Sequence, residues 1–142
     1  MFRKPLAIVV LAGLVLFGLI QLLPFGPDQV NPPVVEEPAW DSTQTRALAQ
    51  RACFDCHSNE TAWPWYSNIA PPSWLLARHV TEGRESMNFS DWGNYSVRTT
   101  KVIQQIEAGK MPPASYLPLH PEARLSAAEK AQLIEGLRNS LD

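Results

Sequence analysis

The residues whose types and spacing could do chemistry are two cysteines and a histidine, in the pentapeptide Cys53-Phe54-Asp55-Cys56-His57. On a helical turn, positions i, i+3 and i+4 lie on one face, so two thiols and an imidazole are presented together. Each thiol can form a thioether with a vinyl group of a porphyrin, and the imidazole can then bind the iron. The C-x-x-C-H spacing therefore predicts one covalent haem c on Cys53 and Cys56, with His57 as the proximal iron ligand.

Two other chemistries use closely spaced cysteines, and the sequence disfavours both. The chain contains only these two cysteines. A thioredoxin-like dithiol would stand at the start of a helix that follows a strand, and no strand-helix-strand pattern surrounds Cys53. A zinc site needs more ligands than Cys53, Cys56 and the scattered histidines easily supply.

The second axial position of the iron has three candidate side chains. Met111 lies in a loop that prolines hold extended, so its thioether can be presented to iron at low entropic cost. His79 is the best-placed second imidazole, on the apolar side of an expected helix. His120 is flanked by prolines in a loop and is more typical of a cap or surface residue. We therefore predict Met111 as the distal ligand, and such a His–Met pair would raise the reduction potential of the haem; His79, His120 and an open position are the alternatives.

Aromatic and basic side chains could complete a haem pocket. Four large aromatic residues fall within twelve positions, at Trp63, Trp65, Tyr66 and Trp74. They either pack the core of a small domain or line the haem and donate hydrogen bonds to a propionate. Three arginines could pair with propionates or remain solvated surface charges: Arg78, Arg84 and Arg98.

Four helical stretches must position these groups, and no stretch alternates with period two, so we predict an all-α fold. The clearest helix begins at the capping box Ser126-x-x-Glu129 and has an apolar stripe through Leu133, Ile134, Leu137 and Leu141. The other three are expected over about 42–56, 72–85 and 97–108. A helix with C-x-x-C-H, then loops, a Met-Pro and a C-terminal helix resembles the order in class I cytochromes c, which implies a cytochrome-c-like domain.

The N-terminal segment has the composition of a membrane anchor. Residues 6–23 contain no charge, and a helix of that length spans roughly 27 Å, close to the hydrocarbon thickness of a bilayer. We predict a transmembrane helix within residues 1–23, in the inner membrane, crossing once. Arg3 and Lys4 favour an N-terminus on the cytoplasmic side, so the haem domain would face the periplasm or the cell exterior. A cleaved signal peptide and a buried core helix are the alternatives.

The rest of the chain divides into a stalk and one domain. Residues 24–38 contain five prolines and predict an extended, semi-rigid stalk, which leaves residues 39–142 for the haem-binding domain. From Glu36 onward the net charge is −3, since that part keeps all but two of the 12 basic and all but one of the 14 acidic residues. No basic patch indicates nucleic acid, and a mildly acidic face would suit a basic redox partner.

Beyond the pentapeptide, the chain resembles the bacterial haem-binding domain family of small exported proteins. The resemblance spans about residues 45 to 138, essentially the whole exported domain. It implies a covalent haem c and a cytochrome-c-like helical fold, and it implies no defined reaction. The matching residues are Cys53–Thr61, Trp63–Ser67, Ala70-Pro71, Trp74, His79-Val80, Glu82-Gly83-Arg84, Asn88-Phe89-Ser90, Gly109–Pro113, Tyr116, His120–Ser126 and Glu129.

The function expected from these features is one-electron transfer outside the cytoplasm, by a carrier rather than a catalyst. With both axial positions filled by protein, iron changes oxidation state with little rearrangement. One rival is a haem-based sensor or small haem enzyme with an open or exchangeable sixth iron position. The other is a thiol–disulfide module. The sequence does not identify the redox partners.

Overall fold

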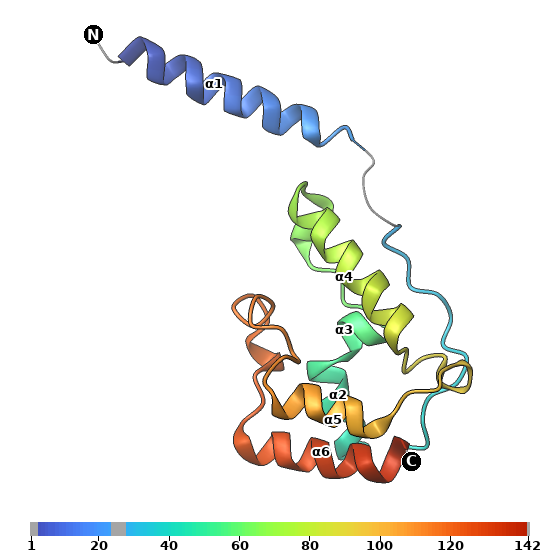
Figure 1. Cartoon of the computed structure of the whole chain (residues 1–142). Coiled ribbons are helices and arrows are strands. Elements are labelled where there is room, and N and C mark those ends of the chain that lie inside the picture. Colours follow the sequence, from blue (N-terminus) through green and yellow to red (C-terminus); the bar gives the residue numbers. More distant parts are fainter. Residues whose placement is uncertain (1–2, 24–27, 142) are drawn as a thin grey trace. The chain divides into compact units, whose positions relative to one another are not determined.

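The computed structural model describes residues 3–23 and 28–141, and this part of the chain folds into six α-helices without a strand (Figure 1). The predicted all-α class is confirmed. An isolated parallel bridge joins Glu36 and Asp91. The helices are α1 (Arg3–Ile20), α2 (Thr43–Ala52), α3 (Phe54–His57), α4 (Pro72–Ser86), α5 (Thr99–Glu107) and α6 (Ala127–Leu141).

The chain forms two compact units, and α4 contributes residues to both. The first unit consists of Met1–Gln29 with Trp63–His79, and the second of Val30–Ala62 with Val80–Asp142. The predicted haem ligands Cys53, Cys56, His57 and Met111 all belong to the second unit, whereas His79 belongs to the first.

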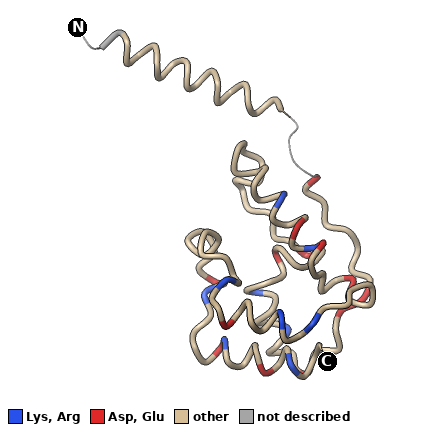
Figure 2. The backbone as a smooth tube through the Cα atoms, viewed as in Figure 1, with Lys and Arg blue, Asp and Glu red and all other residues tan. Residues whose placement is uncertain are grey.

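Helix α1 is apolar, and its large Leu, Val, Ile and Phe side chains are exposed. Figure 2 marks no charged residue along the coloured part of this helix. It ends at Ile20 rather than at Leu23, and Gln21 then exchanges two hydrogen bonds with the backbone of Ala70, at 2.9 and 3.1 Å. Over residues 3–23 and 28–141, we find no helix with both the length and the apolar character that crossing a bilayer requires. The transmembrane helix predicted over residues 6–23 is therefore not confirmed.

The core of the second unit forms where α6 packs against α2 and α5. Helix α6 begins as its capping box predicts: the Ser126 amide donates to Glu129 at 2.8 Å, and the Glu129 amide donates to the Ser126 hydroxyl at 3.2 Å. The predicted apolar stripe buries Leu133 and Leu137 in this core. The buried cluster comprises Leu48, Ala49, Phe54, Met87, Phe89, Ile106, Leu133 and Leu137.

The helix predicted over 42–56 is two helices, and that prediction is corrected here. Helix α2 ends at Ala52, Cys53 leaves the helical region at φ −129°, and the single turn α3 follows. The break turns Phe54 into the core, where its side chain is only 1% exposed. Burial of one large aromatic ring contributes more than one helical hydrogen bond, so the chain bends at Cys53.

The described part of the predicted stalk, residues 28–38, is extended as expected but packs on the second unit from Val30 onward. The amides of Val35 and Glu36 both donate to the Ser90 carbonyl, at 2.8 and 3.1 Å. The side chain of Asn59 donates to the Pro33 carbonyl at 2.8 Å. Residues 24–27 of the predicted stalk lie outside the described residues.

Candidate functional site

The imidazole of His57 is held from one side by two backbone carbonyls. Its Nδ1 lies 2.9 Å from the carbonyl oxygen of Gly83 and 3.2 Å from that of Met87. Carbonyl oxygens only accept, so the proton sits on Nδ1 and leaves Nε2 with its lone pair. Burial also lowers the pKa of His57 and keeps the ring neutral. A neutral imidazole with its N–H fixed in this way is the form in which histidine binds metals.

Gly83 allows α4 to come this close to α3. A Cβ at this position would overlap the carbonyl oxygen of Cys56 and lie 2.9 Å from its carbonyl carbon. Any larger residue would push the helix away from Cys56, and with it the carbonyl that fixes His57. A glycine is therefore required for this contact.

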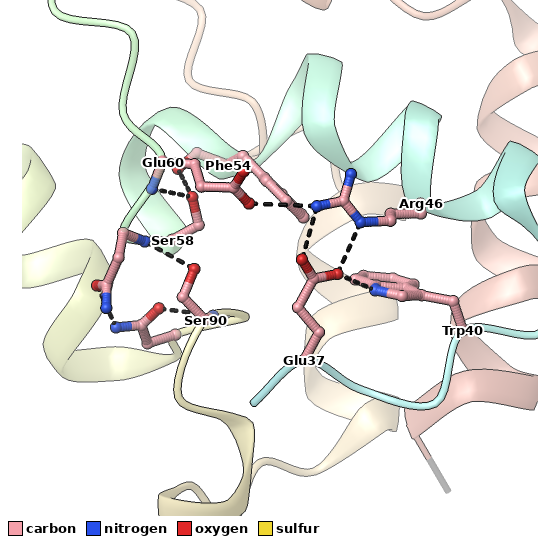
Figure 3. A network of polar contacts seen from close by, with 9 residues as sticks. Glu37, Trp40, Arg46, Phe54, Ser58, Glu60 and Ser90 are labelled. Carbon is pink, nitrogen blue, oxygen red and sulfur yellow. Dashed lines mark hydrogen bonds and ion pairs between the residues drawn. The ribbon is translucent and has the colours of Figure 1, made fainter. Parts of the chain in front are cut away.

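A cluster of aromatic rings fixes Phe54, the residue that follows Cys53, and with it the short helix α3. The ring of Phe54 stacks on Phe89 with centroids 5.5 Å apart and lies 6.2 Å from Trp40. The guanidinium of Arg46 covers the same ring at 5.3 Å. Glu37 accepts from both Nε and Nη2 of Arg46 and from the indole N–H of Trp40 (Figure 3). These contacts fix the direction in which α3 presents its side chains.

Polar contacts also fix the backbone directly after His57. The Phe89 amide donates to the His57 carbonyl at 2.8 Å, and the Asn59 amide donates to the Ser90 hydroxyl at 2.9 Å (Figure 3). The side-chain amide of Asn88 donates to Asn59 Oδ1 at 2.9 Å. Hydrogen bonds from the segment 88–90 therefore hold residues 57–59 in place.

Arg84 completes this support from α4. Its guanidinium donates to the carbonyls of Ser58 and Val30, to Asn31 Oδ1 and to the Thr61 hydroxyl, at 2.8 to 2.9 Å. These acceptors are neutral, and burial lowers the pKa of Arg84. The sequence left Arg84 as either a propionate partner or a solvated surface charge. In the structure its donors bind acceptors of three chain segments, at residues 30–31, 58 and 61.

A cavity of about 520 Å³ opens beside His57, within the range typical of small-molecule and cofactor sites. Cys53, His57 and Met111 all line it. Two basic side chains, Arg98 and Lys101, line it as well, and no acidic side chain among the described residues does. The remaining lining residues are Ser86, Met87, Ser96, Val97, Val102 and Gln105.

A second cavity, of about 320 Å³, shares Cys53 and Met111 with the first. It is lined by apolar residues of α5 and α6 and their loops, with Arg124 and Lys130 as its charged members. Met111 borders both cavities, and its side chain is 39% exposed. Cys56 lines neither cavity.

The two alternative histidines lie elsewhere. His79 is exposed on α4 and lines neither cavity. His120 is buried: its ring stacks on Tyr116 with centroids 3.9 Å apart, and its Nδ1 lies 3.2 Å from Glu122. Of the three candidate distal ligands, only Met111 lines a cavity with His57. Their roles at iron stay predictions.

The aromatic segment predicted either to pack a core or to line the haem belongs to the first unit. Trp65 is 79% exposed and meets Tyr66 edge to face, with centroids 5.7 Å apart. Of the three arginines considered for propionates, Arg98 alone lines the cavity of His57.

The two thiols have the electrostatics of buried cysteines rather than of a reactive dithiol. Burial raises the pKa of Cys53 to about 12. Burial, with the neighbouring Asp55 carboxylate, raises that of Cys56 to about 11. Redox-active pairs instead have thiol pKa values lowered by positive surroundings. In the described parts of the chain, no three His, Cys, Asp or Glu side chains gather into a metal site.

A family model described as haem-binding domain matches residues 15–139. The chain belongs to this family. Neither the curated proteins nor the solved structures contain a match. The family assignment supports a haem cofactor, and the residues present fit one. The haem-binding domain offers an imidazole with a free Nε2, a thioether, an apolar wall from Met87, Val97 and Val102, and two cations suited to propionates.

Two features of the haem-binding domain were missed from sequence. Lys101 faces the cavity with Arg98, one helical turn earlier, and this spacing could have indicated a shared direction. The hydroxyl of Tyr116 donates to the Asp55 carboxylate at 2.5 Å, which joins the loop after Met111 to the turn between Cys53 and Cys56. Burial and this hydrogen bond raise the pKa of Tyr116. No local signal predicts a contact between positions so far apart.

Proposed function

We propose that this protein is a c-type haem protein that carries single electrons outside the cytoplasm. The observation that carries the proposal is that Cys53, His57 and Met111 line one cavity, with Nε2 of His57 free to bind a metal. A histidine and a thioether beside the same cavity are the protein ligands of a six-coordinate, electron-transferring haem.

Each residue has a role in this proposal. When bound, the haem supplies an iron centre that alternates between two oxidation states. Cys53 and Cys56 would hold the porphyrin through thioethers, and His57 and Met111 would bind its iron. The Cys56 thioether is supported by the C-x-x-C-H pattern alone, since its side chain does not line the cavity in this conformation.

Charge and burial would then tune the site. Arg98 and Lys101, beside the cavity, would pair with the propionates. The Nδ1–H bonds from His57 to Gly83 and Met87 would orient the ring and raise its basicity as a ligand. These are the levers by which a protein sets a haem potential in a cytochrome-c-like domain.

A haem-based sensor or small haem enzyme is the second candidate. It is favoured by the 39% exposure of Met111 and by its position between two cavities, because a ligand held so loosely can exchange for a small molecule. The two functions differ in whether the sixth position of the reduced iron accepts carbon monoxide.

The location belongs to the proposal as well. The uncharged run of residues 6–23 after Arg3 and Lys4 supports export, with the N-terminal segment retained in the inner membrane. Export also agrees with covalent attachment, which keeps a haem from being lost to the surroundings. Fractionation of cells that express the full chain, with alkali extraction of the membranes, tests this location.

The decisive experiment is expression of the full chain in a bacterial host that exports and matures c-type haem proteins. We expect haem staining that survives denaturing electrophoresis, a mass increased by one haem, and a six-coordinate low-spin spectrum that ignores carbon monoxide. Cys53→Ala should lose most of the stain, whereas Gln50→Ala, on α2 shortly before it, should keep it. A polypeptide of unmodified mass with two alkylatable thiols would refute the proposal; rapid carbon monoxide binding would favour the second candidate.

A further inference from the structure

The basic residues around the two cavities have a different environment from most other cations of the chain. Arg98 and Lys101 line the first cavity, and Arg124 and Lys130 line the second. Lys110 lies between Gly109 and Met111, which both line the second cavity. We call these five residues the basic rim. Within residues 3–23 and 28–141, no acidic side chain lines either cavity.

Several cations outside the basic rim are neutralised by ion pairs, whereas the cations of the rim are not. Arg46 pairs with Glu37 and Glu60, at 2.6 and 3.2 Å, and Arg51 with Glu129 at 2.6 Å. In contrast, no rim residue forms an ion pair with a carboxylate anywhere in residues 3–23 and 28–141.

Arg138 and Lys130 both lie on α6, and they differ in the same way. It lies 4.0 Å from Glu107 and 3.4 Å from Glu135, whereas Lys130 on that helix has no acidic partner. Rim side chains other than Lys130 are exposed. A chain with a net charge of −2 therefore gathers unneutralised positive charge at the openings beside Cys53 and Met111.

We propose that the basic rim is the docking surface for an acidic protein that exchanges electrons with the haem. This inference rests on the proposed function. Two propionates would neutralise two of the five cations, and the rim would stay positive with the haem in place. Positive charge around the edge of a redox centre attracts an acidic partner, speeds its encounter and orients it toward that edge.

An acidic partner is the opposite of the basic partner expected from composition. A net charge of −3 over the exported part suggested a basic partner, but net charge does not say where the charges lie. An anionic lipid surface is the other ligand that such a rim could meet. We favour a protein because the rim surrounds the proposed haem site, and electron exchange with the haem needs a redox partner at that edge, which a lipid headgroup layer does not supply.

The test uses the full chain in detergent and poly-L-glutamate as the probe, with poly-L-lysine for comparison. Binding is measured by titration calorimetry at low and at physiological salt, with or without haem attached. We expect poly-L-glutamate to bind at low salt, to weaken about tenfold on going to physiological salt, and to bind far better than poly-L-lysine. Arg124→Glu and Lys130→Glu should each weaken it several-fold.

Arg138→Glu is the matched control, with the same change in charge on a cation that already has acidic partners. It should change poly-L-glutamate binding by less than twofold. A kinetic arm uses haem-loaded protein: oxidation by hexacyanoferrate(III) should slow as salt is added, and oxidation by the cationic tris(1,10-phenanthroline)cobalt(III) should speed up. Lys130→Glu should reduce the first salt dependence, and Arg138→Glu should leave it unchanged.

The outcomes separate the two proposals. Haem-loaded protein that prefers poly-L-lysine, or equal losses in Arg124→Glu and Arg138→Glu, would overturn the docking surface and leave the proposed function in place. If the chain acquires no covalent haem in a host that matures c-type haem proteins but still binds poly-L-glutamate through Arg124 and Lys130, the proposed function is refuted and the rim remains an anion-binding surface. Phosphatidylglycerol vesicles form the last arm: if the two rim variants weaken binding to vesicles but not to poly-L-glutamate, the rim recognises lipid, and the proposed protein partner is wrong.

Discussion

Replacing Gly83 by alanine should disturb the proximal side of the site more than any other single methyl group. The added Cβ would overlap the Cys56 carbonyl oxygen and lie 2.9 Å from its carbonyl carbon and 3.1 Å from its Cβ. Normal carbon–carbon contact is about 3.5 to 4.0 Å, so α4 must move away from α3 by roughly 1 Å. The overlap cannot be relieved locally, because the atoms that the new methyl group meets are mainly backbone atoms of Cys56, which cannot rotate aside as a flexible side chain does.

That movement acts directly on His57. Its Nδ1 lies 2.9 Å from the Gly83 carbonyl, and a shift of roughly 1 Å takes this separation beyond hydrogen-bonding distance. Overpacking costs about 1–3 kcal/mol and the lost hydrogen bond about 0.5–1.5 kcal/mol, while alanine recovers about 1 kcal/mol of helix propensity. We expect Gly83→Ala to lower the free energy of unfolding by about 1–3 kcal/mol.

The spectroscopic consequence separates this effect from general destabilisation. With its Nδ1–H bond weakened, His57 becomes a poorer electron donor, and the reduction potential of the haem should rise. Gly136→Ala is the control, because its Cβ would lie 2.8 Å from Thr45 Cβ, at the contact of α6 with α2. It should cost similar stability, measured by urea unfolding, with an unchanged potential. Equal potentials for wild type and Gly83→Ala would refute the role given to the Gly83 carbonyl.

Three further predictions concern the distal side and the fold. Met111→Ala should lower the haem potential by on the order of 0.1 V and open the reduced iron to carbon monoxide in stopped-flow mixing; a variant that still excludes carbon monoxide would rule out this ligand. Tyr116→Phe keeps the ring but removes the 2.5 Å hydrogen bond to Asp55, and should cost about 1.5–3 kcal/mol in urea unfolding; no loss would mean that the loop is held by other contacts. Hydrogen bonds from Arg46 hold the pKa of Glu37 below its ordinary 4.5, so this pair stabilises the fold above about pH 4.5 and loses that contribution as the pH falls further. Glu37→Gln should flatten that dependence in thermal melts at several pH values, and an unchanged slope would contradict it.

Local signals predicted those parts of the fold that local interactions determine. The capping box at Ser126 and Glu129 was predicted and lies at the start of α6, because both of its hydrogen bonds join residues three positions apart. The expected helix over 42–56 was wrong at Cys53, because the break serves the burial of Phe54 against Phe89 and Trp40. Nothing within a helical turn of Phe54 indicates which distant rings will cover it.

The candidate site shows the same division. The C-x-x-C-H spacing and the Met-Pro loop, both short patterns with a chemical reason, indicated Cys53, His57 and Met111, which border the cavity, and also Cys56, which does not. The reason for the glycine at position 83 and the direction of Lys101 depend on which elements meet in space. The composition did not predict where charge gathers on the surface. A net charge summed over the chain cannot show that carboxylates pair with Arg46, Arg51 and Arg138 and not with the basic rim.

The two sides of the site differ in what holds them, and the difference has a functional meaning. On the proximal side, His57 is fixed by two carbonyls, and the adjoining turn by the rings around Phe54 and the bonds of Arg84. All of these are contacts within the protein. On the distal side, Met111 is 39% exposed between two cavities, so its position depends far more on what fills them. Proximal substitutions should therefore change protein stability with or without haem, whereas substitutions at Met111 should change only the properties of the bound iron.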